Sequence, residues 1–174
     1  MEVKKTKIYF AKTKENAVIP SKREEDGCYD IYACLDQNML IEPFSVALIP
    51  TGIASAFDSK WRLAIRERGS NTKAALITMA GQVDSGYRGE IFVAVYNGNG
   101  RPVILSRDVE DYDKSCRNEL GAIIVPASKA IAQFAMEQVP KLSVEEVSID
   151  ELTKVPSERG DGALGSSGKE GGIN

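Results

Sequence analysis

Residues 91–100 read IFVAVYNGNG, an unbroken apolar run that closes on a stretch of asparagine and glycine. A run of this kind is typical of a strand that is buried on both faces and ended by a turn. Upstream, the side chains of residues 61–66 (WRLAIR) alternate in polarity, which predicts a strand with one face in water.

Other short apolar segments lie on both sides of these two, at residues 8–10, 46–50, 122–125, 131–136 and 142–147. Many short strands separated by Gly, Pro and Asn turns predict an antiparallel all-β fold, a sandwich or a distorted jelly-roll barrel. Helix is scarce, and residues 72–79 are the best candidate for one short helix, although β-branched residues weaken it.

The composition excludes several classes of chemistry. The chain has 174 residues, 43% of them apolar and 27% charged, enough for one domain whose core needs no disulfide or metal. It contains no histidine, which removes Ser-His-Asp and Cys-His nucleophile systems and histidine-rich metal sites. The net charge of −3 offers no basic field for duplex nucleic acid.

The same sequence carries no sign of export or of a membrane segment. Three cysteines form no CxxC pair, and the charged N-terminus is not followed by an apolar stretch. The longest apolar run is far shorter than the roughly 20 residues of a membrane helix. We therefore expect a reduced, cytoplasmic protein that does not contact a membrane.

Two segments break the strand pattern. Residues 106–119 are strongly polar and predict an inserted surface loop, either a plain solvated loop or a contact for a protein partner. Residues 157–174 are rich in glycine and have no apolar cluster, which predicts a flexible arm beyond a domain of residues 1–156. Within the arm, residues 159–168 (RGDGALGSSG) could wrap backbone N–H groups around a phosphate and act as a lid.

Three polar clusters are candidates for chemistry. Residues 81–90 (GQVDSGYRGE) predict a hairpin tip that displays Asp84 and Tyr87, although a plain turn with a packed tyrosine fits equally well. Residues 66–70 (RERGS) suit a polyphosphate, and a solvated charged loop is the alternative. Gln133 lies inside an apolar run, so its amide is either part of a structural network or a ligand contact.

Together these clusters resemble the five ordered motifs of the trimeric all-β dUTP diphosphatase (dUTPase) family, across residues 3–168. The third motif, GxIDxxYRGE, is matched almost letter for letter by residues 81–90. The first resembles residues 27–33 (GCYDIYA), and the second is approximated by residues 67–70 (ERGS). The fourth survives as residues 131–133 (IAQ), and the fifth resembles residues 159–168.

The resemblance implies hydrolysis of dUTP to dUMP and pyrophosphate, with Mg²⁺ carried on the triphosphate. By position, Asp84 is the general base for water attack on the α-phosphorus, and Tyr87 lies under the sugar and excludes a 2′-OH. Asp30 holds metal-bound waters from the second shell. Homotrimeric assembly, with sites shared between subunits and closed by another subunit's arm, is also implied. The remaining substrate contacts that the resemblance implies are Arg68, Gly69, Ser70, Gly81, Val83, Gln133, Arg159, Leu164, Gly165, Ser166 and Ser167.

The chain departs from the family pattern at several positions. Ser70 falls one place late in the second motif, and Lys129-Ala130 replaces an acid-Arg pair in the fourth. Leu164 stands where an aromatic residue usually stacks on uracil, which predicts a weaker grip on the base. Cys28 replaces a small residue of the first motif and suits a buried thiol. The 106–119 insert lengthens the connection between the third and fourth motifs.

Three other functions fit parts of the pattern. The related dCTP deaminases carry a glutamate where this chain has Ala94, so deamination lacks its acid. A nucleotide-gated binding protein without activity would gain nothing from a buried base at Asp84. A plain β-sandwich interaction module leaves the ordered polar motifs unexplained.

Overall fold

The structure is a computed structural model that describes residues 6–109 and 121–161, and its contacts divide the chain into two units. The described residues of the first unit, residues 1–140, form twelve strands, and the second unit comprises residues 141–174. The prediction of an all-β fold is confirmed, and within the described residues no helix has the length and apolar character that crossing a bilayer requires.

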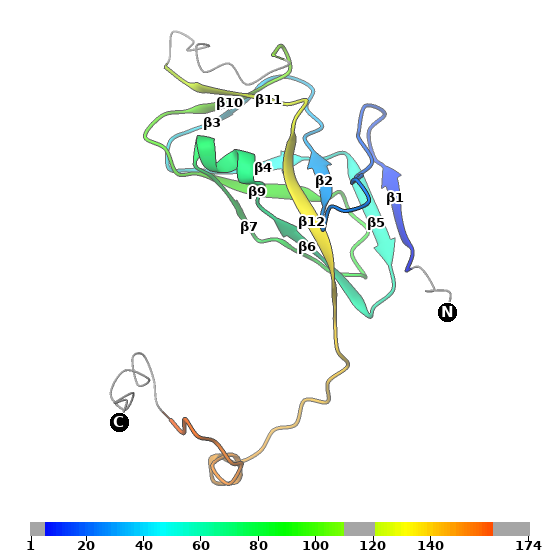
Figure 1. The fold of residues 1–174 in the computed structure, drawn as a ribbon, viewed down its shortest axis with the longest axis vertical. Coiled ribbons are helices and arrows are strands. Elements are labelled where there is room, and N and C mark those ends of the chain that lie inside the picture. Colours follow the sequence, from blue (N-terminus) through cyan, green and yellow to red (C-terminus); the bar gives the residue numbers. More distant parts are fainter. Residues whose placement is uncertain (1–5, 110–120, 162–174) are drawn as a thin grey trace. The chain divides into compact units, whose positions relative to one another are not determined.

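A four-stranded sheet carries three of the residues singled out above, Asp30, Val83 and Gln133, and Figure 1 labels its strands β2, β12 and β6. Its strand order is β2-β12-β6-β8, and every neighbouring pair is antiparallel. The strands are β2 (Tyr29–Tyr32), β12 (Ala130–Gln138), β6 (Trp61–Arg66) and β8 (Gln82–Val83). The long strand β12 lies between β2 and β6, so segments distant in sequence meet at one sheet.

A second, three-stranded sheet has the order β4-β9-β7. Its strands are β4 (Val46–Pro50), β9 (Phe92–Asn97) and β7 (Leu76–Met79). The central strand β9 is the predicted apolar run, but one face alone is fully buried, since its residues alternate between buried and more exposed. The prediction of burial on both faces was therefore wrong for the described part of the first unit, in which the residues on the other face of β9 stay partly or fully exposed.

Two smaller sheets complete the unit. Strand β1 (Ile8–Lys12) pairs antiparallel with β5 (Ile53–Phe57). The other sheet joins β3 (Met39–Ile41), β10 (Val103–Ser106) and β11 (Ile123–Pro126). Strands β10 and β11 are parallel, an exception to the expected antiparallel pairing. The predicted insert at 106–119 falls between them, and residues 110–120 lie outside the described part.

The sheets share one apolar core. Phe134 on β12 is fully buried and stacks on Tyr29 of β2, with 5.1 Å between ring centroids, while Phe10 of β1 approaches from another sheet. Asn97 is also fully buried, and its amide donates to the carbonyls of Ile41, Glu42 and Arg101. This buried amide meets the requirement that a polar group inside the core be hydrogen-bonded.

Two secondary-structure predictions were wrong. The segment predicted as a helix, residues 72–79, is divided between the 3₁₀-helix η1 (Gly69–Ala74) and strand β7. Ala75, in the left-handed conformation at φ 44°, ends η1, and the β-branched residues that follow favour a strand. Residues 142–147 form no strand, since they find no partner strand in their unit, and Val144 is 94% exposed.

The second unit has one helical turn, α1 (Ile149–Leu152). Its capping box joins Ser148 and Glu151, each side chain bonding to the other residue's backbone N–H. The Ser-x-x-Glu spacing in the sequence is the signal that could have predicted it. The predicted division of the chain into residues 1–156 and an arm from 157 stays a prediction.

Candidate active site

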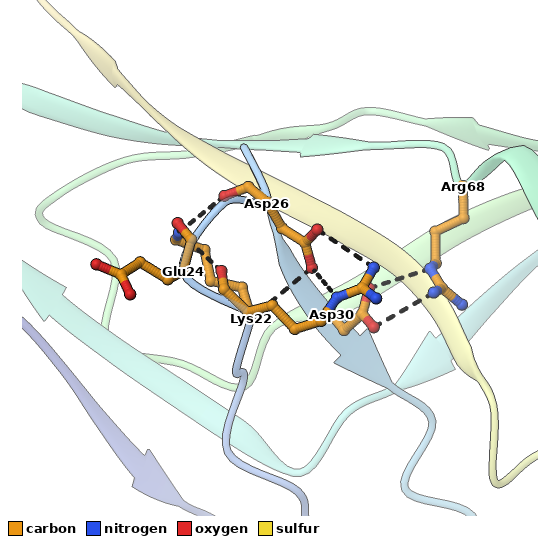
Figure 2. A network of polar contacts seen from close by, with 6 residues as sticks. Lys22, Glu24, Asp26, Asp30 and Arg68 are labelled. Carbon is orange, nitrogen blue, oxygen red and sulfur yellow. Dashed lines mark hydrogen bonds and ion pairs between the residues drawn. The ribbon is translucent and has the colours of Figure 1, made fainter.

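Arg68 is fixed at the end of β6 by contacts to two other strands. Its guanidinium bonds to both oxygens of Asp30 on β2, with 3.1 Å from Nε to Oδ1 and 3.3 Å from Nη2 to Oδ2. Nη1 donates to the carbonyl of Ala130 on β12 at 3.1 Å. Figure 2 shows the two side chains facing each other across β12. Both are half-buried, so the bidentate pair holds the guanidinium in one orientation.

Gln133 lies in a polar row that the strand register creates. It stands opposite Asp30 on β2 and opposite Arg66 on β6. Its amide nitrogen donates to the carbonyl of Glu67 at 2.8 Å, which ties the residues before Arg68 to β12. Of the two alternatives predicted for Gln133, a structural network or a ligand contact, this bond gives it the structural role. Gln133 also lines the pocket described next.

A loop before β2 completes this pocket. Lys22 donates from its ammonium to the carbonyls of Arg23, Glu24 and Asp26, at 3.1, 3.0 and 2.7 Å (Figure 2). The Arg23 guanidinium bonds to Asp26 and lowers the pKa of that carboxyl. The pocket, of about 550 Å³, is lined by Ser21, Lys22, Arg23, Asp26, Gly27, Cys28, Asp30, Arg68 and Gln133.

Sequence reasoning missed Lys22 and Arg23 as pocket residues. Their signal was the run of charges at residues 22–26, directly before the first motif. Cys28 also lines the pocket and is half-buried, so the fully buried thiol expected there was wrong. Among the described cysteines, Cys34 is the buried one.

Ser70 and Gly69 lie in η1, directly after Arg68. Ser70 lines a different pocket of about 320 Å³, together with Arg68, Lys73 and Lys129. The structure thus brings Ser70 beside Arg68 but not into the pocket of Gln133. Arg68 lies between the two pockets, so one guanidinium borders both.

The third motif begins on β8 and continues as a turn. The Gly81 carbonyl accepts from the N–H of Ile65, and Val83 is buried opposite Leu63. Asp84 opens a turn in which the Tyr87 N–H donates to its carbonyl at 3.1 Å. Asp84, Val83 and Tyr87 line a pocket of about 290 Å³ with Gln82, Glu90, Phe92 and three other residues.

Two expectations about this segment were wrong. Strand β8 pairs with β6, whereas β9 pairs with β4 and β7, so residues 84–91 cross between two sheets and do not form a hairpin. Asp84 is exposed in the single chain and not a buried base. The short β8 ends at Val83, so the carboxylate stands beyond the last paired residue.

Asp84 and Arg68 lie far apart when their positions are measured along the direction of β6. Val83 pairs with Leu63, and Arg68 follows Leu63 by five residues of extended chain. At about 3.3 Å a residue, this places Arg68 roughly 16 Å beyond the level of Val83. The two residues line different pockets, so one chain does not bring the predicted base to the predicted phosphate contacts.

The predicted lid residues fall in the second unit. Ser157 accepts at its hydroxyl from the N–H groups of Arg159 and Gly160, at 3.2 and 3.0 Å. Leu164, Gly165, Ser166 and Ser167 lie outside the described residues. Across the described ranges 6–109 and 121–161, no group of three acidic, cysteine or histidine side chains could hold a metal ion.

Comparison with known proteins identifies the family of the chain. The family model described as dUTPase matches residues 14–108. The deoxyuridine 5′-triphosphate nucleotidohydrolase of Wolinella succinogenes is 32% identical over 172 residues, which is 97% of this chain and 98% of the relative. The enzyme of the same name from Leptospira interrogans is 37% identical over 95 residues, and that match spans 52% of this chain and 66% of the relative.

Solved structures share the fold. A dUTPase of Staphylococcus bacteriophage 80alpha, solved with dUpNHpp, superposes with a TM-score of 0.72 at 22% identity, covering 93% of this chain and 98% of the phage chain. A dUTPase of EIAV gives a TM-score of 0.58 at 21% identity over 83% of this chain and 98% of that one. The arrangement of sheets is thus the jelly-roll β fold of these proteins. The chain belongs to the dUTPase family of nucleotide-hydrolysing enzymes.

Proposed function

We propose that this chain hydrolyses dUTP to dUMP and pyrophosphate, with Asp84 as the general base for water attack on the α-phosphorus. Family membership supports the reaction. The observation that supports the mechanism is the turn after β8, which displays Asp84 and Tyr87 in one pocket beside the backbone of Val83. A carboxylate needs this access to orient a water and accept its proton.

Phosphoryl transfer needs charge neutralisation opposite the base. Arg68 supplies a fixed guanidinium whose planar donors suit a phosphate, and Gln133 and Ser70 border the same residue. In this proposal they bind the phosphate chain, and Gly69 contributes backbone. The arm residues Arg159, Leu164, Gly165, Ser166 and Ser167 close over the nucleotide, with leucine covering uracil in place of an aromatic ring.

In this proposal, the third motif (residues 81–90) recognises uracil and deoxyribose. Backbone groups of Gly81 and Val83 face the base in this proposal, and the ring of Tyr87 lies against the sugar and leaves no room for a 2′-OH. Tyr87 is 47% exposed and borders the pocket of Asp84, which supports a role in contact with ligand.

Mg²⁺ fits this site as an ion that arrives on the triphosphate. The described residues lack a protein cage for a metal, and Mg²⁺ commonly keeps its waters and binds through substrate phosphates. Asp30 offers two carboxylate oxygens, each bonded to Arg68, and each keeps a lone pair that can accept from a metal-bound water. When bound, the ion would neutralise charge on the leaving pyrophosphate.

The separation of Asp84 from Arg68 favours a site shared between subunits of a homotrimer. The sheet β4-β9-β7 supports such an assembly, because one of its faces is apolar and exposed. By register, Val46 and Ile77 flank Tyr96, while Leu48 and Met79 flank Ala94. Leu48 is 61% exposed, and Val46, Ile77, Met79 and Phe92 are also exposed. Contiguous apolar surface of this kind marks protein interfaces.

Assaying a panel of nucleoside triphosphates for pyrophosphate release, with and without Mg²⁺, tests the proposal. We expect Mg²⁺-dependent release from dUTP and little release from dTTP, dCTP or UTP. Equal release from all four nucleotides, or none from dUTP, would contradict it. Release of ammonia from dCTP would instead indicate a deaminase.

A further inference from the structure

The turn that displays Asp84 and Tyr87 has little backbone support of its own. Residues 84–91, all of which are described, belong to no strand, and they connect β8 to β9 across two different sheets. Besides the bond from the Tyr87 N–H to the Asp84 carbonyl, side chains hold it. The guanidinium of Arg88 donates to the carbonyls of Ser85 and Tyr87 within the turn, at 2.6 and 2.9 Å, and to the Ser55 carbonyl on β5 at 3.5 Å.

The far end of the turn is anchored by Glu90. Its Oε1 accepts from the backbone N–H of Gly52 at 2.8 Å, and its Oε2 accepts from the Thr13 hydroxyl at 3.4 Å. Next to it, the Ile91 N–H donates to the Ile53 carbonyl at 2.8 Å. Glu90 therefore joins the turn to the start of β5 and to the segment after β1.

The anchor point at Gly52 is rigid. Gly52 has φ 65°, and a Cβ atom there would lie 2.8 Å from both Ala17 Cβ and Cys34 Sγ. The residue is buried, so its N–H has a fixed direction and the carboxylate of Glu90 must come to it. A hydrogen bond from a fixed N–H to a charged acceptor is among the stronger ones in proteins.

Glu90 also holds the ring that faces the sugar in the proposed site. The Tyr87 hydroxyl donates to the backbone carbonyl of Glu90 at 2.9 Å. The ring lies so close over Gly89 that a Cβ there would be 2.7 Å from Tyr87 Cζ. The ring position is thus set by the backbone of residues 89–90, and the Glu90 side chain holds that backbone together with the bond from the Ile91 N–H to Ile53.

We propose that Glu90 is a positioning residue for sugar selection, which holds Tyr87 where it excludes ribose by anchoring the turn to Gly52. This inference rests on the proposed function and adds to it a residue that no substrate contact requires. Without the anchor, the ring moves with the turn, and room for a 2′-OH appears.

The test compares kcat/KM for dUTP with kcat/KM for UTP in the full chain. The ratio is measured on one preparation, so a change in the fraction of folded enzyme does not alter it. We expect Glu90→Ala to lower the ratio by about tenfold, the size expected for losing one hydrogen bond to a charged acceptor. Glu90→Gln keeps an acceptor for Gly52 and is expected to keep the ratio within about twofold of the unmodified chain.

A second variant keeps the test decisive if Glu90→Ala does not fold. Tyr87→Phe removes the bond to the Glu90 carbonyl and leaves the carboxylate in place, and it should lower the ratio as well. An unchanged ratio in Glu90→Ala, or in Tyr87→Phe where the alanine variant is insoluble, would overturn the inference. If the unmodified chain does not hydrolyse dUTP at all, the proposed function fails first, so the two failures are distinguishable.

Discussion

Arg68 and Asp84 belong to one proposed site, yet the chain fixes them by different means. Arg68 follows a strand of the four-stranded sheet and is held by Asp30 and the Ala130 carbonyl, both on strands of that sheet. Asp84 lies past the end of β8, exposed, on a turn whose support comes from the side chains of Arg88 and Glu90.

This difference suggests separate roles: the preformed region around Arg68 binds the substrate, and the exposed region around Asp84 carries out the reaction. A guanidinium fixed by strand register is oriented before any ligand arrives, so little ordering remains to oppose phosphate binding. The exposed carboxylate gains its surroundings on assembly and nucleotide binding, when a neighbouring subunit and the arm exclude water in the proposed trimer. The following experiments test whether the two regions act in this way.

The largest effect is expected at Asp84, the proposed general base. Asp84→Asn removes the base and keeps the size of the side chain, so kcat for pyrophosphate release from dUTP should fall by about 10³-fold. Binding of dUTP, measured by calorimetry, should change little, because the phosphate contacts remain. An unchanged kcat would remove Asp84 from its role, and an equal loss of binding would make it a binding residue.

Mixing two inactive variants tests whether the Asp84 and the Arg68 of one site come from different subunits. Asp84→Asn and Arg68→Ala subunits, unfolded together and refolded at equal amounts, should regain activity in about one quarter of the sites by random pairing. Each variant refolded alone is the control and should stay inactive. Absence of regained activity in trimers shown to be mixed would place both residues of a site on one chain.

The sequence predicted the strands well and the pairing poorly. The polarity pattern of residues 61–66 corresponds to β6, and the apolar run at 91–96 corresponds to β9 within one residue at each end. The partners of β8, β9 and β10 depend on contacts between distant residues, which no local pattern contains. Residues 72–79 were misread because Ala75 takes a left-handed conformation that ends η1. The contact that joins η1 to β12, from the Asn71 amide to the Ile131 carbonyl at 2.6 Å, links residues that are 60 positions apart and leaves no local pattern.

The sequence named candidate site residues, but it did not predict the contacts that hold them in place. The family motifs pointed to Arg68, Gln133 and Asp30, and the register of β2, β12 and β6 brings these three together. The carbonyl contacts of Lys22 and the bond from Gly52 to Glu90 involve backbone groups whose positions follow from the fold. A motif shows residue types, and it does not show which backbone atom a side chain will meet.

Assembly should respond to charge on the apolar face of β4-β9-β7. Leu48→Asp places a carboxylate on that face at a residue that is 61% exposed, so we expect a monomer by light scattering and a loss of most dUTP hydrolysis, at least tenfold, since desolvating an unpaired charge is costly. Leu40→Asp on β3, which is 46% exposed, is the matched control and should stay assembled. A Leu48→Asp protein that remains trimeric would exclude this face as the interface.

A smaller effect is expected at Arg68, the proposed phosphate contact. Arg68→Lys keeps the charge but cannot bond to both oxygens of Asp30 and to the Ala130 carbonyl in the same geometry, so KM for dUTP should rise about tenfold with a smaller change in kcat. Arg66→Lys is the control, since Arg66 pairs with Glu137 on the same strand pair and should change KM little. Equal effects of the two substitutions would mean that charge alone, and not the fixed fork, binds phosphate.

The smallest effect is expected at Glu137, whose ion pairs lie on the same sheet but are not part of the proposed site. Hydrogen bonds from Arg62 and then Arg66 hold the pKa of Glu137 below its usual value near 4.5. Because the folded-state pKa is the lower one, the pair stabilises the fold above the usual glutamate range, and this contribution is lost as pH falls through the folded-state pKa. Glu137→Gln should therefore lower the Tm by a few degrees at neutral pH and by less in acid, measured by calorimetry. A Tm difference that does not shrink in acid would assign the effect of Glu137 to packing and not to its charge.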